Sequence, residues 1–364
     1  MAEIIEGSIA IGLGALDSGC DAYCSYPVTP QNEIIEWFSR EFPARGRTFR
    51  QSTSEIESTF ISMGFAAAGA RTMTSTAGPG WGLYPEGMSH IVAAELPLVV
   101  ALIMRGGPGQ GSTRHSQMDY TSATRPGGQG GYKNIVLAPY SCQECYDLTQ
   151  LAFHLTEKYR NPVMILSEPN VTRMLELVER KSTDYGPVPD KDWALKGRGR
   201  HKDQRPSLIT SGHGMTPTEE YPDYRSYLHR LHDKFKEMES EIRYEEYETE
   251  DAEIILVAYG YPARTCREAT KQARSQGIKV GLIRPISLWP FPVEPIRRRA
   301  GTGAKFLVVE DNLGDIGGLV DDVRLAASGK AEIRMVTALD RHEPGESGAI
   351  YTGKVLDKIK NMQG

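Results

Sequence analysis

Apolar and polar residues follow one another along the first half of the chain in a pattern that predicts strands and helices in turn. Residues 96–104 are almost continuously apolar, which is typical of a strand buried on both faces in a parallel sheet. Residues 32–42 carry apolar side chains at helical spacing. The other predicted helices of this half are 7–19, 60–69 and 142–159, and the other predicted strands are 21–25, 71–76, 134–138 and 162–167. This β-α-β rhythm indicates an open α/β sheet.

The rhythm breaks after residue 185. Residues 186–222 hold clusters of Gly, Pro and charged residues without an apolar period, which favours an irregular connector. A charged helix is predicted to follow over 224–244, and the acidic run that closes the segment favours a solvated linker.

The second half restores the α/β rhythm. The predicted strands are 253–258, 279–283, 306–309 and 333–336, and the predicted helix is 262–276. We therefore expect two open α/β domains, residues 1–185 and 251–364, joined by an irregular linker with a charged helix over 186–250.

Length and charge narrow the functional classes. A chain of 364 residues fits two domains. Its 42 basic and 47 acidic side chains give a net charge of −5, whereas a nucleic-acid binder usually has a basic excess. The apolar run 96–104 contains Pro97 and is far shorter than the roughly 20 residues of a membrane span. The acidic N-terminus does not resemble a signal peptide. We expect a soluble, cytoplasmic protein that binds neither nucleic acid nor membrane.

The cysteines and histidines give weak metal signals. Cys142 and Cys145 form a CxxC pair, and Cys20 and Cys24 form a CxxxC pair. These could be metal or iron–sulfur ligands, or four half-buried residues at helix spacing. The chain has an odd number of cysteines, 5, and its 8 histidines show no paired ligand spacing. We expect no disulfide framework and no metal held by this chain alone.

Two motifs follow predicted strands and have open interpretations. In YPVTP, Tyr26 to Pro30, Thr29 could cap the next helix with Pro30 at its first position. Alternatively its hydroxyl could hold an anionic substrate, because open α/β sheets bind ligands at the carboxyl ends of their strands. Arg105 directly follows the apolar run, so its charge lies near the core and needs an anionic partner. That partner could be a structural carboxylate or a substrate carboxylate.

Two further segments precede or open helices. Glu55 and Glu57 precede the predicted helix 60–69, where they could interact with the helix dipole or transfer protons. The sequence does not choose between these roles. The loop AGPG, Ala77 to Gly80, could cradle a phosphate, although it matches no Walker or dinucleotide pattern.

These motifs occur together in an order that resembles the alpha subunit of 2-oxoacid:ferredoxin oxidoreductases, of the separate-subunit 2-oxoglutarate or 2-oxoisovalerate kind. The resemblance rests on YPVTP near residue 30, the acidic helix start near 55, TSTAGPG near 78 and RGGPG at 105. It resumes in GIKVGLIRPISLWPFP and FLVVEDNLG, which resemble the family's transketolase-C-like domain. It is weak over 186–250. The first domain would then be of the thiamine-diphosphate pyrimidine-binding type.

The resemblance implies roles for individual residues. Members of the family decarboxylate a 2-oxoacid with thiamine diphosphate, pass electrons to ferredoxin and release acyl-CoA. Glu55 would hydrogen-bond N1′ of the pyrimidine ring and favour its imino tautomer. Thr29, with Tyr26 beside it, would contact the substrate, and Arg105 would bind its carboxylate. Gly78 and Gly80 would line the cofactor site.

Missing motifs imply partner subunits. The chain has no GDG followed by Asn, the family's magnesium–diphosphate signature, and no ferredoxin-like cysteine run. The resemblance therefore implies a hetero-oligomer. A beta subunit would hold the diphosphate through Mg²⁺, a ferredoxin-like delta subunit would carry [4Fe-4S] clusters, and a gamma subunit would complete the complex. Ferredoxin, CoA and a 2-oxoacid are the expected reactants, in an anaerobic metabolism.

Some features depart from the family or leave alternatives. The stretch RGGPGQGSTRHSQMD differs from the usual RGGPSTGLPT, although Gln117 and Asp119 are retained, so the sequence does not identify the 2-oxoacid. Two other classes compete. One is the beta-type subunit of a thiamine-dependent 2-oxoacid dehydrogenase, and the other is a non-catalytic α/β regulatory subunit.

Overall fold

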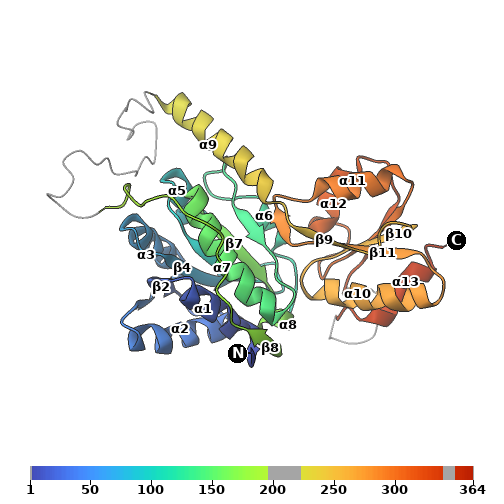
Figure 1. Ribbon diagram of the computed structural model, residues 1–364, viewed down its shortest axis with the longest axis horizontal. Coiled ribbons are helices and arrows are strands. Elements are labelled where there is room, and N and C mark those ends of the chain that lie inside the picture. Colours follow the sequence, from blue (N-terminus) through green and yellow to red (C-terminus); the bar gives the residue numbers. More distant parts are fainter. Residues whose placement is uncertain (1, 196–222, 339–348, 364) are drawn as a thin grey trace.

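The computed structural model describes residues 2–195, 223–338 and 349–363, which form two α/β units side by side (Figure 1). The elements of the first unit are β1 (Ala2–Glu6), α1 (Gly7–Asp17), β2 (Ala22–Ser25), α2 (Asn32–Ala44), β3 (Thr48–Gln51), α3 (Glu55–Ala67), β4 (Thr72–Ala77), α4 (Gly78–Trp81), α5 (Pro85–Ala93), β5 (Val99–Ile103), α6 (Tyr120–Thr124), β6 (Ile135–Leu137), α7 (Cys142–Tyr159), β7 (Val163–Ser167), α8 (Pro169–Thr172) and β8 (Leu175–Glu179). The later elements are α9 (Tyr224–Met238), η1 (Glu239–Glu241), β9 (Tyr244–Tyr247), β10 (Ile254–Val257), α10 (Gly260–Ser275), β11 (Val280–Pro285), β12 (Ser287–Trp289), α11 (Val293–Gly301), β13 (Lys305–Val309), α12 (Leu319–Ala327), β14 (Ile333–Val336) and α13 (Thr352–Lys360).

The first unit is built on a seven-stranded sheet with the order β12-β6-β7-β5-β4-β2-β3. All of its pairs are parallel except β12 with β6. Along β5, Val99, Ala101 and Ile103 enter the core under α1, α2 and α7, whereas Val100 and Leu102 enter the core under α3 and α5. Burial on both faces explains why this strand is continuously apolar in sequence.

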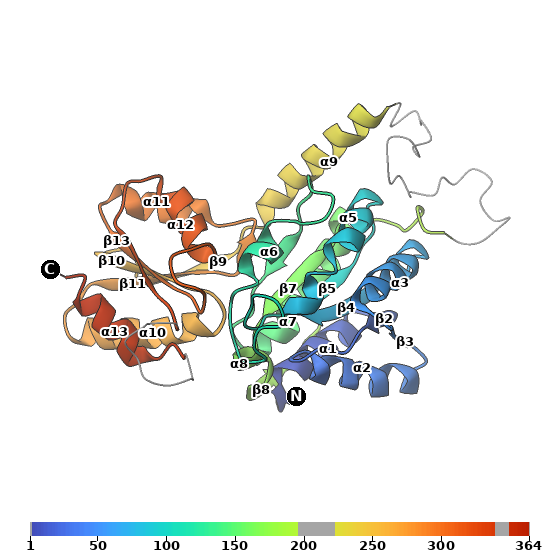
Figure 2. The same cartoon turned by 180° about the vertical axis from the view of Figure 1, so that it is seen from behind.

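The second unit has a five-stranded sheet with the order β14-β13-β10-β11-β9, in which only β9 is antiparallel to its neighbour. Helices α10 and α13 cover one face, and α11 and α12 cover the other (Figures 1 and 2). The expected fold class, with two open α/β sheets, is confirmed.

The two units share one hydrophobic core. Trp81 and Tyr120 of the first unit belong to the same buried cluster as Phe306 and Leu319 of the second. The strand β12 also leaves the second unit and pairs with β6 of the first sheet. The loops that follow the carboxyl ends of β5 and β7 meet those that follow β13 and β10, since the Gln117 N–H donates to the Asp311 carbonyl oxygen and the Tyr261 N–H donates to Glu168.

Some elements differ from the sequence-based expectations. Helix α3 begins at Glu55 rather than near residue 60, because Ser54 caps it by accepting a hydrogen bond from the N–H of Glu57. The acidic run was interpreted as a solvated linker, but it contains β9, and Glu245 and Glu246 form ion pairs with Arg284 and Arg298. The sequence analysis did not predict β1, β3, β8, β12, α5, α11, α12 or α13. Most of the predicted connector, 196–222, lies outside the described residues.

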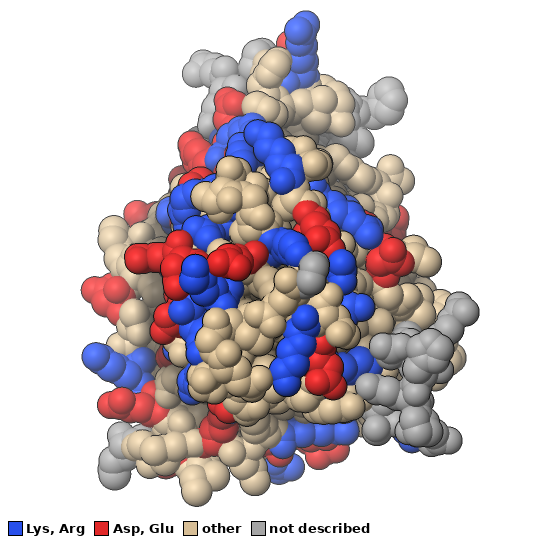
Figure 3. Space-filling view, turned by 90° about the vertical axis from the view of Figure 1, so that its right-hand side faces the viewer, with Lys and Arg blue, Asp and Glu red and all other residues tan. Residues whose placement is uncertain are grey.

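The outer surface of the second unit carries both charge signs. Basic and acidic side chains are interspersed over the face that Figure 3 shows. Ion pairs of this unit include Arg274–Asp251, Arg298–Glu294 and Arg334–Glu332. Over the described ranges, no helix is long and apolar enough to cross a membrane.

Candidate active site

The predicted site residues gather at one edge of the first sheet. Tyr26 and Thr29 follow β2, Gly78 and Gly80 follow β4, and Arg105 follows β5. These strands are parallel, and β4 is the neighbour of both β2 and β5, so their carboxyl ends lie together. Glu55 reaches the same edge from the first position of α3.

Thr29 does not cap the helix that follows it. Helix α2 starts at Asn32, its cap position is Gln31, and that cap has no side-chain hydrogen bond. The Thr29 hydroxyl instead accepts a hydrogen bond from Asn32 Nδ2 at 3.2 Å, and its carbonyl oxygen faces Arg105. The capping interpretation was therefore wrong, and the hydroxyl proton of Thr29 is available to a ligand.

A buried glutamine fixes the turn that carries Tyr26 and Thr29. Gln31 is fully buried, and its Nε2 donates to the carbonyl oxygen of Tyr26 at 2.9 Å. Its Oε1 accepts from the Ser75 hydroxyl of β4 at 2.7 Å. The sequence analysis did not find this residue. In the sequence, only the position of this polar residue directly after Pro30 of the YPVTP motif pointed to it.

Arg105 is buried, and no carboxylate among the described residues pairs with its guanidinium. It is 7% exposed, and its Nη1 donates to the Thr29 carbonyl oxygen at 2.8 Å. Its Nη2 donates to the Gln110 carbonyl oxygen at 2.7 Å, and its Nε has no hydrogen-bond partner among the described residues. Asp119 accepts from the backbone N–H of Arg105 at 3.2 Å rather than from its side chain. The guanidinium thus keeps its positive charge and an unused donor.

The two glutamates of α3 have different surroundings. Glu57 turns back to accept hydrogen bonds from the N–H and hydroxyl of Thr53, which lower the pKa of its carboxyl. Glu55 lies against β4: a Cβ on Gly80 would come within 2.9 Å of Glu55 Oε1 and 2.4 Å of Thr76 Oγ1. Thr76 Oγ1 is buried without a hydrogen-bond partner. Gly80 is therefore the residue that lets the Glu55 carboxylate approach the sheet edge.

A cleft of about 820 Å³ opens beside Arg105 between the two units. Its lining consists of Gly78, Pro79, Trp81, Gly82, Leu83, Arg105, Gly106, Gly107, Pro108, Gly109, Gln110, Met118, Asp119, Thr121, Ser122, Asn312, Leu313, Ile316 and Gly318. Burial raises the pKa of the Asp119 carboxyl to about 6, although Arg105 opposes this rise. Gly78 leaves room for the Asp119 carboxylate, since a Cβ at this position would lie 2.9 Å from Asp119 Oδ2.

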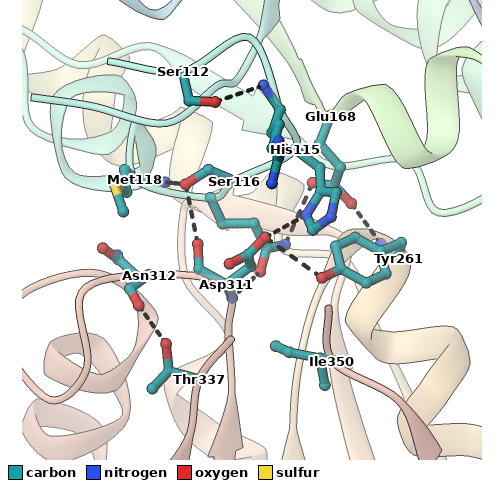
Figure 4. A network of polar contacts seen from close by, with 12 residues as sticks. Ser112, His115, Ser116, Met118, Glu168, Tyr261, Asp311, Asn312, Thr337 and Ile350 are labelled. Atoms are coloured by element: carbon teal, nitrogen blue, oxygen red, sulfur yellow. Dashed lines mark hydrogen bonds and ion pairs between the residues drawn. The ribbon is translucent and has the colours of Figure 1, made fainter. Parts of the chain in front are cut away.

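A second group of polar residues, which the sequence analysis did not select, lies where the two units meet. Figure 4 shows His115, Glu168, Tyr261 and Asp311 in this network. Glu168 directly follows β7 and Asp311 lies two residues after β13, so each acid lies just beyond a buried strand. Arg105 was selected because a charged residue follows a buried apolar strand, and the same pattern in the sequence could have identified these two acids.

The cysteines are all buried free thiols. Cys142 and Cys145 lie in the first turn of α7, and burial raises the pKa of both thiols. Within the described ranges, no group of three or more His, Cys, Asp or Glu side chains could hold a metal ion.

Comparisons with known proteins cover both units. Residues 13–244 match the family described as pyruvate flavodoxin/ferredoxin oxidoreductase, thiamine diphosphate-binding. Residues 252–346 match pyruvate:ferredoxin oxidoreductase core domain II. The chain is 40% identical to the ketoisovalerate oxidoreductase subunit VorB of Methanothermobacter thermautotrophicus, covering 100% of this chain and 98% of that protein. It is 34% identical to the 2-oxoglutarate synthase subunit KorA of Methanothermobacter marburgensis, covering 99% and 98%.

A solved structure is similar over nearly the whole chain. It is the 2-oxoglutarate:ferredoxin oxidoreductase from Magnetococcus marinus with 2-oxoglutarate, coenzyme A and succinyl-CoA bound. The TM-score is 0.81 at 25% identity, and the match covers 99% of this chain but 65% of that one. The longer chain therefore contains more than the two units described here.

Proposed function

The chain belongs to the pyruvate flavodoxin/ferredoxin oxidoreductase family and is a 2-oxoacid:ferredoxin oxidoreductase subunit, and we propose that it acts as the alpha subunit. In this role it supplies the pyrimidine half of the thiamine diphosphate site and the contacts to the substrate carboxylate. The complete enzyme converts a 2-oxoacid, CoA and oxidised ferredoxin into acyl-CoA, CO₂ and reduced ferredoxin. Family membership favours this function over a dehydrogenase beta-type subunit or a regulatory subunit.

The single observation that carries the proposal is the burial of the Arg105 guanidinium without a carboxylate partner among the described residues. Among the described residues the guanidinium has only neutral oxygens as partners and its Nε donor is unused, which suits a carboxylate ligand. The attraction is stronger than on the surface because the guanidinium is buried. Once the substrate carboxylate leaves as neutral CO₂, this charge-assisted contact is lost, so Arg105 binds the substrate better than the product.

The residues around Glu55 fit the pyrimidine ring of thiamine diphosphate. The Glu55 carboxylate has no side-chain hydrogen bond among the described residues, the neighbouring Thr76 Oγ1 is also unpartnered, and Gly80 leaves room beside both. Bound thiamine diphosphate would supply the electron sink for decarboxylation. In the proposed arrangement Glu55 accepts a hydrogen bond at N1′ of the ring and orients it. Gly78 and Gly80 keep the loop free of side chains that would fill this space.

Thr29 and Tyr26 contribute substrate contacts in the same proposal. The Thr29 oxygen already accepts a hydrogen bond from Asn32, so its own proton can point to the keto or carboxylate oxygen of the substrate. Tyr26 is half-buried on the same turn, whose backbone is held by Gln31. Together with Arg105 these groups would fix the orientation of a 2-oxoacid.

The lining of the cleft favours a 2-oxoacid with an apolar side chain. Arg105 is the one basic residue among the described residues that line it. A single guanidinium can pair with the one carboxylate of a 2-oxoacid that has an uncharged side chain. Trp81, Leu83 and Met118 supply apolar surface, and Asp119 would repel a second carboxylate once ionised. The relative at 40% identity is named for ketoisovalerate, whereas relatives named for 2-oxoglutarate reach 34%.

Partner subunits complete the site in this proposal. A beta subunit binds the diphosphate through Mg²⁺, a ferredoxin-like delta subunit carries [4Fe-4S] clusters, a gamma subunit joins them, and ferredoxin accepts the electrons in the cytoplasm. Exposed apolar side chains around the site support this. Leu83, Leu313 and Ile316 at the cleft are 45%, 54% and 78% exposed, and Ile56 beside Glu55 is 46% exposed. Such patches commonly mark protein interfaces.

We also propose that the unit over 1–185 is the pyrimidine-binding-type domain, that 251–364 is transketolase-C-like, and that 186–250 connects them. The boundary between the two family matches, at 244 and 252, supports the start of the second unit, whereas the first match continues through residues 186–244.

The first experiment tests whether the chain is a subunit with this activity. The chain is purified alone and as a complex co-expressed with its partner subunits, and dye reduction dependent on CoA and 2-oxoacid is measured. The complex should be active, with a higher kcat/KM for branched apolar 2-oxoacids than for 2-oxoglutarate. The isolated chain with added thiamine diphosphate and Mg²⁺ should be inactive. Robust turnover by the isolated chain would contradict the subunit proposal.

The second experiment tests Arg105. In the assembled complex, Arg105→Ala should lower kcat/KM for every accepted 2-oxoacid, because losing one partner of a buried charge pair costs about 2–5 kcal/mol. Arg173→Ala is the control, since Arg173 forms an ion pair with Glu33 outside the cleft. Equal kcat/KM for Arg105→Ala and the control would exclude Arg105 as the carboxylate ligand.

A further inference from the structure

Gln117 joins the loop after Arg105 to the second unit. Its backbone N–H donates to the Asp311 carbonyl oxygen at 2.7 Å, and its Oε1 accepts from the Asp311 N–H at 2.9 Å. Its Nε2 donates to the Tyr259 carbonyl oxygen at 3.2 Å and lies 3.4 Å from Glu168 Oε2. Gln117 is fully buried. One side chain therefore connects residues that follow β7, β10 and β13.

The neighbours of Gln117 strengthen this attachment (Figure 4). The Ser116 hydroxyl donates to the Asp311 carbonyl oxygen at 3.3 Å and accepts from the Met118 N–H at 3.2 Å. His115 Nδ1 lies 2.7 Å from Asp311 Oδ2, and its ring packs against Tyr261 with centroids 5.6 Å apart. Three consecutive residues thus contact the second unit at Asp311.

Residues near both ends of the same loop contact Arg105. The Gln110 carbonyl oxygen accepts from the guanidinium, and the Asp119 carboxylate accepts from the Arg105 backbone. Ser112 N–H donates to the Gly106 carbonyl oxygen at 2.8 Å and closes the loop on itself. The loop must therefore keep one shape for Gln110 to meet Arg105.

The sequence of the loop does not favour one shape. Gly106, Gly107, Gly109 and Gly111 lie within six residues, and glycine has more accessible backbone conformations than any other residue. At Gly111, φ is +52° and a Cβ would clash with the Gly106 carbonyl oxygen, so glycine is required there. Ordering such a loop carries an entropic cost that must be met by contacts elsewhere.

We propose that Gln117 is a positioning residue, which uses the second unit as a fixed support to hold residues 106–119 in the shape that orients Arg105. The proposal rests on the proposed function of Arg105. Gln117 does not line the cleft. Gln117 would act indirectly, because it orders the loop 106–119 and thereby orients Arg105 before the substrate binds.

The test compares Gln117→Met with Gln150→Met in the assembled complex. Gln150 is also buried, and its side chain ties α7 to residues 181–183 through bonds to Lys181 and Thr183, away from the cleft. Two quantities are measured: hydrogen–deuterium exchange of peptides within 106–119, and KM and kcat for the 2-oxoacid and for CoA. Methionine keeps the side-chain length but removes the side-chain hydrogen bonds. The net contribution of one such bond changes the equilibrium between the ordered and the disordered loop by up to about tenfold.

Gln117→Met should speed exchange in 106–119 and raise KM for the 2-oxoacid about tenfold, with a smaller change in kcat and an unchanged KM for CoA. Gln150→Met should change neither the exchange of 106–119 nor that KM. Should Gln117→Met fail to assemble, Ser116→Ala removes one contact to Asp311 and should give smaller shifts in the same direction.

The outcomes separate this proposal from the function it rests on. Faster exchange with an unchanged 2-oxoacid KM would overturn it, because the loop would then not orient the site. Unchanged exchange would overturn it as well. If the wild-type complex used no 2-oxoacid, the proposed function would fail while the exchange data still showed whether Gln117 orders the loop.

Discussion

Glu55 and Glu57 lie in the same turn of α3 and have the same chemistry, but their neighbours differ. Glu57 accepts two hydrogen bonds from Thr53 and completes the start of the helix. The Glu55 carboxylate lies against Gly80 and Thr76, and it has no hydrogen bond among the described residues. The helix start therefore uses one carboxylate and leaves the other for a ligand.

We predict that Glu55→Gln slows the reaction before any step that involves the substrate. An amide at N1′ cannot favour the reactive tautomer of the pyrimidine as a carboxylate does, and general acid–base groups contribute about 10²–10⁴-fold in rate. The measurement is hydrogen–deuterium exchange at C2 of thiamine diphosphate in the assembled complex.

Glu57→Gln is the matched control for Glu55→Gln. It should leave C2 exchange unchanged and lower the stability of α3, as loss of a helix-start contact does. If Glu57→Gln slows C2 exchange and Glu55→Gln does not, the assignment of Glu55 is wrong.

Asp119 makes substrate binding depend on pH. Burial raises the pKa of its carboxyl to about 6, so the group is neutral below this pH and negative above it. A negative charge beside the Arg105 site opposes the substrate carboxylate. We predict that KM for the 2-oxoacid rises roughly tenfold as pH increases through about 6.

Asp119→Asn should remove this pH dependence and keep a low KM on both sides of pH 6. The measurement is KM for the 2-oxoacid between pH 5 and 8 in the assembled complex. A rise of KM near pH 6 that persists in Asp119→Asn would assign the titration to another group.

Among the elements, α9 is attached to the first unit by charge as well as by packing. Lys234 is 9% exposed and lies 3.1 Å from Glu95 Oε1, and Arg230 lies 3.3 Å from the other oxygen of this carboxylate. Burial alone would raise the pKa of the Glu95 carboxyl, but the positive charges of Lys234 and Arg230 outweigh it and lower the pKa. The helix is thereby fixed over the segment between α5 and β5.

We predict that Lys234→Met destabilises the protein by about 3 kcal/mol, because it leaves a buried carboxylate with too little positive charge. Lys236→Met on the same helix is the control. Lys236 pairs with Glu239 on the surface, where such pairs contribute about 0–1 kcal/mol. Urea unfolding followed by circular dichroism measures both. Equal midpoints for the two variants would show that the Lys234–Glu95 pair does not stabilise the helix.

On the scale of the whole molecule, the two sheets meet at their carboxyl ends, and this junction buries acids. Glu168 accepts a hydrogen bond from the Tyr261 N–H at 2.6 Å, and Glu310 accepts from the Leu319 N–H at 2.9 Å. Burial raises the pKa of each carboxyl to about 8. These acids therefore bind a proton more tightly in the folded than in the unfolded protein.

The sign of the resulting pH effect follows from linkage. For a raised pKa, the stabilising contribution is fully present below the unfolded value of 4.5 and is lost as pH rises through about 8. We predict that the melting temperature of the wild type falls between pH 6 and pH 8.5. The melting temperature of Glu310→Gln should fall less over the same range. Each pKa unit corresponds to about 1.4 kcal/mol.

The control for Glu310→Gln is Glu268→Gln, since Glu268 is half exposed and contacts neighbours on its own helix, Gln272 Nε2 at 2.8 Å and Lys271 Nζ at 4.0 Å. It should melt like the wild type at every pH. Calorimetric melting at pH 6 and pH 8.5 measures all three proteins. If Glu310→Gln loses as much stability on going to pH 8.5 as the wild type, Glu310 does not contribute to the pH effect.

The sequence by itself determined the order of the main strands and helices and the positions of Thr29 and Arg105 at strand ends. Helix 142–159 was predicted with the bounds that the structure gives to α7. These features are encoded locally, because periodicity, continuous apolar runs and the first polar residue after them are visible within a few residues. A resemblance in the motifs supplied the family, which the comparisons confirm.

Only the tertiary structure decided which of two nearby glutamates faces the sheet edge, how β12 joins the first sheet, and what surrounds Arg105. Gln117 and Asp311 are 194 residues apart in sequence, and Glu168 and Tyr261 are 93 apart. Such contacts follow from non-consecutive strand order and from the meeting of two sheets at their carboxyl ends, which no local pattern encodes. Burial at that junction then sets the charge of Asp119, Glu168 and Glu310, because the cost of desolvation depends on the whole fold.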